Sequence, residues 1–438
     1  MLPKDRLLAR LFGVALVAHV IGNWHQPDLP SLVGIIELLV GLLGIALMVA
    51  PTRSIWLIAA ATTVLSVVGE IPQTGNHWLL AGLASLIILF TRGLRFATGL
   101  RWLLVVFYAF AAFAKLNTGF FDPTTSCAVF YANQSLNSWG FRELLTNSVA
   151  ATIAVWSTAL IELAVVPLLL WNRTRWIGIV VGSVFHGLIS LDFDQHFYDF
   201  TAVLFFLFAA FLPPSHLEAG ATMNSRFLLW ARRIGAALAF ALVLMSVLPS
   251  SPITTSLLSV LPFLLWVPIL FWWIGFIFRR REWVGLDWRL APATALVVVV
   301  AFLNGLTPYV ELKTAYSFNM YSNLLTAQGE TNHFLVPQTF PLRDGYDGPV
   351  QIVESSDPGL QVYRDRDYLI AFPQFQQYLV GRSVSVTYMR DGVSTTTADT
   401  QSVTGLATSG RWWWRFMPLR ALDQQSPPRC QDVFLPAL

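Results

Sequence analysis

Long apolar blocks, separated by short polar breaks, run through the first 306 residues of this 438-residue chain. Blocks close to 20 residues have the length that an α-helix needs to cross a bilayer. Several blocks are near the short limit, so we expect tilted helices or burial within the protein. The pattern predicts about eleven membrane-spanning helices, at Leu7–Gly22, Leu32–Ala50, Ser54–Val68, Trp78–Thr91, Gly99–Asn117, Ala150–Trp171, Trp176–Leu191, Tyr198–Leu212, Phe227–Leu248, Leu257–Phe278 and Leu290–Leu306.

The distribution of basic residues between these helices indicates an orientation. With a cytoplasmic N-terminus, the outer loops between helices hold a single basic residue, Arg142. Translocation disfavours Lys and Arg near helix ends, so we expect the N-terminus inside and everything after Leu306 outside the cytoplasm. The inner segments hold the other basic residues, namely Lys4, Arg6, Arg10, Arg53, Arg92, Arg95, Arg101, Arg173, Arg175, Arg226, Arg232, Arg233, Arg279, Arg280, Arg281 and Arg289.

The character of the chain changes near Gly305. Short alternating runs separated by Asp-Gly and Pro-Gly turns read as strands at Pro349–Val353, Leu360–Tyr363 and Ser383–Tyr388. Two further segments are predicted as helices, Pro373–Val380 and Arg411–Leu422. The chain therefore divides into a membrane bundle at 1–306 and an extracytoplasmic domain at 307–438, which is β-rich or α+β.

Composition supports the membrane assignment, since 55% of the residues are hydrophobic and only 12% are charged. Soluble domains carry about 25% charged residues. The net charge of +3 is dispersed in short clusters, which does not favour nucleic acid as a partner. No cleavable signal is evident, so we expect the first span to stay in the membrane. The Arg-rich, Lys-poor composition indicates a bacterial cytoplasmic membrane.

Two cysteines, Cys127 and Cys430, are too few for a disulfide scaffold. Both fall on the predicted outer side, where oxidising conditions permit a bridge between the tail and the bundle. The alternative is two unpaired small apolar residues.

Ionisable side chains at membrane depth are costly, so each needs a partner, a cavity or a function. Counting from Arg101 at about 1.5 Å per residue places Lys115 roughly 20 Å above the inner face. The other buried ionisable groups also favour the middle or outer half of the bundle, and sharing one depth allows them to share a pocket. They are His19, Glu37, Glu70, Glu162 and His186.

Each of these groups has a simpler explanation. Lys115 near a helix end is able to reach the outer interface, although the small neighbours Ala111, Ala112 and Ala114 favour close helix packing. His186 is equally a packed core histidine, and Glu162 a structural hydrogen-bonding group. The loop Asp192–Asp199 combines three acids and a histidine, but solvated charges are commoner there than a cation site, so we expect no metal.

An ordered set of motifs in the bundle resembles the HTTM superfamily, the membrane domain typified by vitamin K-dependent gamma-carboxylase. The set comprises Tyr108-Ala-Phe-Ala-Ala-Phe-Ala-Lys115-Leu-Asn117, Glu162-Leu, Trp171-Asn-Arg-Thr-Arg175 and Phe185-His186. Order and spacing fit over about 107–214, and weaker similarity extends over the bundle. The tail segments 318–324 and 331–337 look like those of uncharacterised bacterial members.

The resemblance implies an enzyme that acts on a reduced quinone at the outer side of the membrane. Lys115 occupies the position of the base that deprotonates vitamin K hydroquinone in the carboxylase, and His186 matches the membrane histidine. In the carboxylase, oxygen converts the anion to a strong base, which removes a proton from a glutamate side chain so that carbon dioxide adds. The substrate-pocket candidates are His19, Glu37, Tyr108, Asn117 and Glu162.

The chain departs from the carboxylase in three respects, one of which is the acid-rich loop Asp192–Asp199, which has no counterpart there. Ala114 stands where the carboxylase has a second lysine, and the C-terminal region is much smaller. We therefore carry over quinone-linked proton abstraction, with an outer peptide or protein as a further partner, but not carboxylation of a protein. A non-catalytic export, immunity or assembly factor whose outer domain binds a partner is the alternative. A transporter is third, because paired broken helices are not evident.

Overall fold

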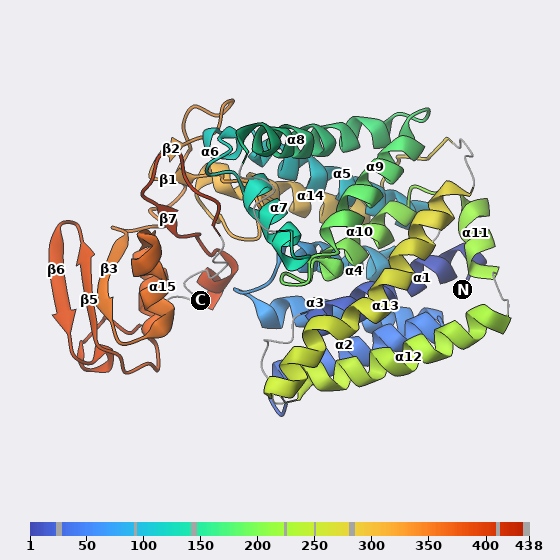
Figure 1. The fold of residues 1–438 in the computed structure, drawn as a ribbon, viewed down its shortest axis with the longest axis horizontal. Helices are drawn as coiled ribbons and strands as arrows, with labels where there is room; N and C mark the ends of the chain where they lie inside the picture. The colour runs from blue at the N-terminus through green and yellow to red at the C-terminus, as the bar shows by residue number, and fades with distance from the viewer. Residues whose placement is uncertain are drawn as a thin grey trace.

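The computed structural model describes residues 1–22, 29–91, 94–141, 147–222, 226–248, 251–279, 285–408 and 412–431. This part of the chain is mostly helical, with the strands gathered at the end of the molecule farthest from the N-terminus (Figure 1). Every predicted span contains a helix. These helices are α1 (Pro3–Gly22), α2 (Leu32–Val49), α3 (Arg53–Glu70), α4 (Asn76–Phe90), α5 (Leu94–Ala114), α8 (Ser148–Leu170), α9 (Arg175–Ile189), α10 (Tyr198–Ala209), α12 (Arg226–Val247), α13 (Pro252–Phe278) and α14 (Pro292–Leu306).

Three further helices lie where the apolar pattern predicts none: α6 (Thr118–Phe121), α7 (Cys127–Ser138) and α11 (Pro214–Thr222). The first two fill what was predicted as a long outer loop. Asn117 caps α6 by accepting a hydrogen bond from the amide of Phe120, and Ser126 caps α7 in the same way. Both helices are too short or too polar to register as apolar blocks.

Six helices in the described part of the chain are long and apolar enough to cross a membrane: α2, α3, α5, α8, α13 and α14. Three other apolar helices, α4, α9 and α10, are shorter. The chain is therefore an integral membrane protein with several apolar helices. The count of eleven spans and the inward N-terminus stay predictions, and Arg92, Arg142, Arg280 and Arg281 lie outside the described residues.

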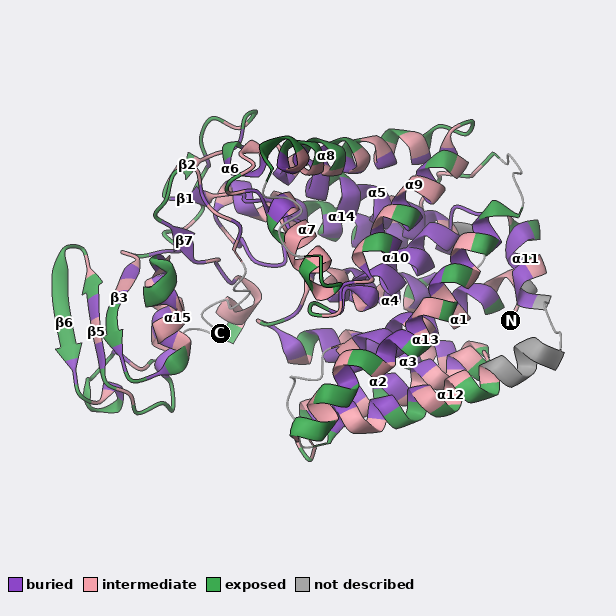
Figure 2. Ribbon diagram, viewed as in Figure 1, coloured by how far each residue is buried: buried purple, intermediate pink, exposed green. Residues whose placement is uncertain are grey.

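Helix α10 forms the centre of the bundle. All its residues except Asp199 are buried, and it packs against α1, α4, α5 and α9 (Figure 2). A helix that is apolar on every side belongs in such a core. Helix α8 is different, because Ile153, Trp156 and Leu160 are exposed while Val155 and Glu162 on the opposite face are buried. Its outer face is suited to acyl chains.

Helices α1 and α2 approach each other through two glycines. A Cβ added at Gly13 would lie 2.6 Å from the carbonyl oxygen of Gly44, and one added at Gly44 would lie 2.8 Å from that of Gly13. Neither backbone has room to move, so only glycine fits at this crossing, as is common between membrane helices.

We expect Gly13→Ala to destabilise the protein, whereas Gly275→Ala in α13 should not. Overpacking a rigid contact costs about 1–3 kcal/mol. A Cβ at Gly275 meets nothing within 4 Å, so this variant controls for the helix propensity of alanine. The measurement is the thermal midpoint of each variant in the same detergent. Equal midpoints for the two variants would contradict a tight α1–α2 crossing.

The C-terminal part contains a five-stranded antiparallel sheet and two helices. The strand order is β6 (Val393–Thr397), β5 (Val386–Arg390), β3 (Val350–Ser355), β4 (Tyr368–Ile370) and β7 (Leu422–Asp423). Helices α15 (Pro358–Arg366) and α16 (Phe372–Leu379) share a separate apolar core with this sheet. A small hairpin, β1 (Thr326–Ala327) and β2 (Glu330–Thr331), precedes it. The α+β alternative therefore describes this region.

The individual helices and strands predicted for this C-terminal part had mixed outcomes. The predicted helix Pro373–Val380 is confirmed by α16. The predicted strand Leu360–Tyr363 is wrong, because these residues lie in α15. There Asp357 accepts a hydrogen bond from the amide of Leu360, and Pro358 occupies the first turn. The predicted helix Arg411–Leu422 is also wrong, since a short 3-10 helix covers Trp412–Phe416 and Leu422 belongs to β7.

The segment after α14 returns to the bundle before the sheet begins. Phe318 and Met320 belong to the core of the bundle, and the amide of Phe318 donates to Asn76 Oδ1 at the start of α4. Arg415 donates to the carbonyl oxygens of Val68 and Ile71 at the end of α3. A boundary between 306 and 307 stays a prediction, and residues 432–438 lie outside the described part.

Cys127 and Cys430 form a disulfide bond across 303 positions of sequence. It joins the start of α7 to the tail, and beside it the amide of Cys430 donates to the carbonyl oxygen of Thr125. Of the two alternatives that the sequence left open, a disulfide bridge or two unpaired cysteines, the structure contains the bridge.

Candidate active site

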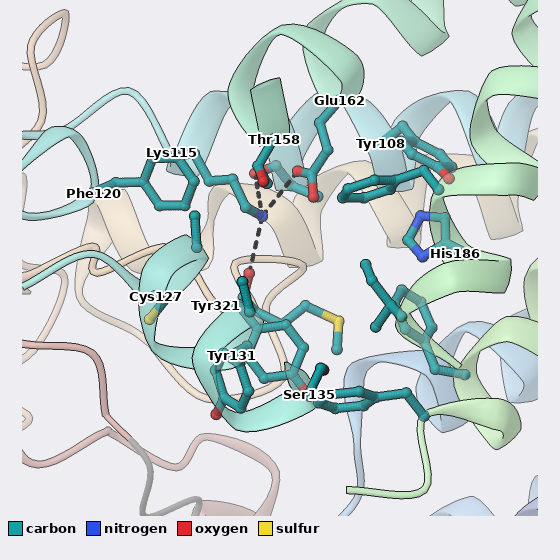
Figure 3. Close-up of a pocket in the computed structure, with 18 of the residues that line it drawn as sticks. Tyr108, Lys115, Phe120, Cys127, Tyr131, Ser135, Thr158, Glu162, His186 and Tyr321 are labelled. Carbon is teal, nitrogen blue, oxygen red and sulfur yellow. Dashed lines mark hydrogen bonds and ion pairs between the residues drawn. The ribbon is translucent and has the colours of Figure 1, made fainter. Parts of the chain in front are cut away.

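A cavity of about 170 Å³ lies among α5, α7, α8, α9 and α10, with the segment at Met320 and Tyr321 closing one side (Figure 3). Its walls are mainly aromatic, and a small number of polar side chains project into it. The polar set that concerns the chemistry is Tyr108, Lys115, Thr158, Glu162 and His186.

Lys115 follows the last residue of α5 and turns inward. Its Nζ lies 2.8 Å from Glu162 Oε2 and donates to the carbonyl oxygens of Met320 at 3.1 Å and Ala111 at 3.4 Å. Only 3% of the lysine is exposed, so it does not reach the outer interface. The Phe120 ring, 5.8 Å from Nζ, covers another side. The small residues of α5 leave the space that this side chain fills.

Glu162 is the counter-ion of Lys115. It sits on the buried face of α8, one helical turn after Thr158. The two opposite charges neutralise each other in apolar surroundings, where either alone would be strongly unfavourable. Glu162 therefore pairs with the lysine and also lines the cavity.

His186 and Tyr108 line the cavity beyond the ion pair, and their rings meet edge to face at 5.7 Å. His186 also packs against Phe200 at 5.0 Å. Both residues are almost completely buried. Within the described residues, neither ring nitrogen of His186 nor the hydroxyl of Tyr108 has a hydrogen-bond partner. A buried polar group left unpaired costs about 1–3 kcal/mol, so these atoms are free to pair with a ligand or water in the cavity.

The size of the cavity limits what it holds. An apolar cavity of about 150 Å³ admits a benzene-sized ring, so this one accommodates a single substituted aromatic ring. Phe107, Phe197 and Phe200 provide apolar walls for such a ring. Figure 3 shows Lys115 and His186 approaching the cavity from different sides. A flat ligand with oxygen atoms at both ends has a partner at each end.

Three other candidates lie elsewhere. Asn117 does not line the cavity. Its side chain donates to the carbonyl oxygens of Ala114 and Ser322, which ties α5 to the returning segment. His19 and Glu37 belong to a second buried group between α1, α2 and α3.

The acid-rich loop does not gather its charges at one point. Asp192 accepts hydrogen bonds from Ser135 and from the amides of Asp194 and Gln195, which holds the loop against α7. Asp199 instead points toward His77 in α4.

Some residues that line the cavity are not among the site candidates predicted from the sequence. Thr158 was detectable, because it lies four positions before Glu162 and therefore on the same helical face. Tyr131, Phe200 and Tyr321 carry no comparable signal. Tyr321 comes from a segment far along the chain with an irregular backbone, with φ at +53°.

Comparison with known proteins gives one match. No curated protein and no solved structure matches the chain. Residues 93–213 match the HTTM domain family. This range runs from the start of α5 to the end of α10 and includes Lys115, Glu162 and His186. The chain therefore carries an HTTM domain and is a member of the HTTM superfamily.

Proposed function

We propose that this protein is a membrane-embedded enzyme that binds a reduced quinone, or a similar lipid-soluble hydroquinone, with Lys115 as the base. The observation that carries the proposal is a buried amine–carboxylate pair in a ring-sized cavity that also holds the unpaired polar atoms of His186 and Tyr108. The HTTM domain is associated with vitamin K-dependent gamma-carboxylase-like membrane proteins, which supports the same reading.

The ion pair sets the order of proton transfers. Lys115 carries a proton while it pairs with Glu162, so it accepts another only after that proton passes to the carboxylate across 2.8 Å. The neutral amine then takes the proton of a phenolic hydroxyl, and the pair has gained one proton overall. His186 and Tyr108 bind the oxygen at the other end of the ring. Aromatic walls keep water away from the deprotonated oxygen.

A bound hydroquinone would supply, after deprotonation and reaction with oxygen, the strong base that the family resemblance implies. Its tail needs a route to the bilayer. Thr158 of α8 and Phe185 and Ile189 of α9 line the cavity and are only half-buried. Their neighbour Leu188 is exposed on the same outer surface. The surface formed by α8 and α9 is therefore the side from which we propose that a lipid-soluble ligand enters.

The disulfide supports the proposed orientation, because such bonds persist on the oxidising side of a membrane. The start of α7 and the tail are then outside the cytoplasm, in keeping with a bacterial cytoplasmic membrane protein. An outer peptide or protein substrate remains part of the proposal.

The test is retention of quinone through purification. We expect lipid extracts of the wild-type protein, analysed by mass spectrometry, to contain quinone in amounts comparable to the protein. Ala111→Phe places a ring inside the cavity and should remove it. Lys313→Met, which changes a buried lysine outside the cavity, should retain it. Equal quinone in Ala111→Phe and wild type, or none in wild type, would contradict binding at this cavity.

A further inference from the structure

A second group of ionisable side chains lies outside the cavity, where α1, α2 and α3 meet. His19, Glu37 and Glu70 are all buried in this group. Within the described residues, no lysine or arginine pairs with either carboxylate. Two charged carboxylates in apolar surroundings strongly disfavour the folded state, so a bound proton or a cation must neutralise them.

The histidine alone does not satisfy both acids. His19 Nε2 lies 2.9 Å from Glu70 Oε1 and 3.8 Å from Glu37 Oε2. One nitrogen donates one proton, and the shorter contact takes it. Glu37 Oε2 consequently has no hydrogen-bond partner in the described part of the chain, although it is buried and faces the same point. A cation at that point would contact all three side chains.

The three side chains are held in place by their neighbours. Ser66 Oγ lies 2.6 Å from Glu37 Oε1 and 3.0 Å from Glu70 Oε1. Trp78 Nε1 donates to this hydroxyl at 2.8 Å, and the indole stacks on His19 with ring centres 3.4 Å apart. Ligands held in fixed positions favour ion binding, because these side chains lose little conformational freedom when the ion binds.

Two further side chains that are able to bind a metal ion, His77 and Asp199, lie beside this group. His77 Nε2 is 2.8 Å from Asp199 Oδ2, and one ligand atom each from His19, His77 and Asp199 lie within 4.8 Å of one another. The same limit holds for His19, Glu37 and Glu70. Donors bound to one ion at about 2.0–2.2 Å lie at most roughly 4.4 Å apart, so small movements suffice. His77 and Asp199 are partly exposed, which gives an ion a way in.

We propose that His19, Glu37 and Glu70 bind one divalent first-row transition metal ion, with His77 and Asp199 at its entrance. Mixed imidazole and carboxylate donors suit zinc, iron or manganese. From the sequence we expected no metal, since only the loop Asp192–Asp199 offered neighbouring donors. The structure instead gathers donors from five helices. The bound ion would fasten these helices behind Phe200, which contacts both His77 and His186.

The experiment uses untagged full-length protein, treated with chelator, incubated with Co²⁺ and desalted. Metal content and the visible absorption of bound Co²⁺ are then measured. We expect one ion per wild-type chain, and at least tenfold less in Glu37→Gln and Glu70→Gln. His216→Gln, which alters a buried histidine outside the group, should bind as wild type does.

Two results would overturn the site. One is wild-type protein that retains no more Co²⁺ than a detergent blank. The other is retention by Glu37→Gln and Glu70→Gln at the wild-type level. Quinone retention is measured separately on the same samples, so failure of the metal site and failure of the proposed function are distinguishable.

Discussion

Lys115→Ala is expected to slow oxygen-dependent oxidation of a reduced benzoquinone by about 10²–10⁴-fold, the usual contribution of a positioned base. The reason is that Lys115 Nζ is the basic nitrogen in the cavity that Glu162 relieves of its proton. The measurement is the absorbance change of the quinone, followed with the protein in lipid nanodiscs. Added small alkylamines should restore part of the rate, because the truncated side chain leaves room beside Glu162.

The matched control is Lys313→Ala. Lys313 is also buried, but it contacts Asn304 and Tyr316 and lies away from the cavity. Its loss should leave the rate close to that of the wild type. Equal rates for Lys115→Ala and wild type, with both proteins folded, would remove the base assignment. They would favour the non-catalytic alternative, in which the outer domain binds a partner.

Glu162→Gln is expected to destabilise the protein by about 3–5 kcal/mol, because it leaves the Lys115 ammonium buried without its counter-ion. The double variant Lys115→Met/Glu162→Leu should recover most of this loss, since neither charge then remains. The unfolding free energies of Lys115→Met, Glu162→Leu and the double variant, each compared with the wild type, give the coupling energy between the two residues.

An exposed pair provides the comparison. Arg364 and Asp365 form an ion pair at 2.6 Å on the surface of α15. Surface pairs contribute about 0–1 kcal/mol, so Asp365→Asn should change the stability little. Additive effects of Lys115→Met and Glu162→Leu would mean that the two side chains do not form a buried pair.

The apolar pattern was sufficient to locate the long helices of the bundle, because an apolar environment requires long apolar runs, while the number that cross the membrane stays a prediction. It failed where other forces act. Helices α6 and α7 are fixed by the caps at Asn117 and Ser126 and by packing, not by hydrophobic length. The alternation at Leu360–Tyr363 indicates a strand, but the cap at Asp357 and the proline in the first turn stabilise helix α15 instead.

The candidate site was predictable to a similar degree. Membrane depth and the family motifs pointed to Lys115, Glu162 and His186, which line one cavity. Nothing in the sequence indicates that the carbonyl oxygen of Met320 accepts a hydrogen bond from Lys115, since 205 positions separate them. His19 and Glu37 were noticed at the right depth, but their grouping with His77 and Asp199 depends on how five helices cross.

The bond between Cys127 and Cys430 makes most of the chain one covalent ring. A single peptide-bond break at an exposed turn such as Asp391–Gly392 therefore leaves two fragments that remain attached to each other. The fragment after the break, which carries β6 and β7, stays tethered to α7 even after such damage. A protease could thus nick the exposed sheet without detaching its last strands from the bundle.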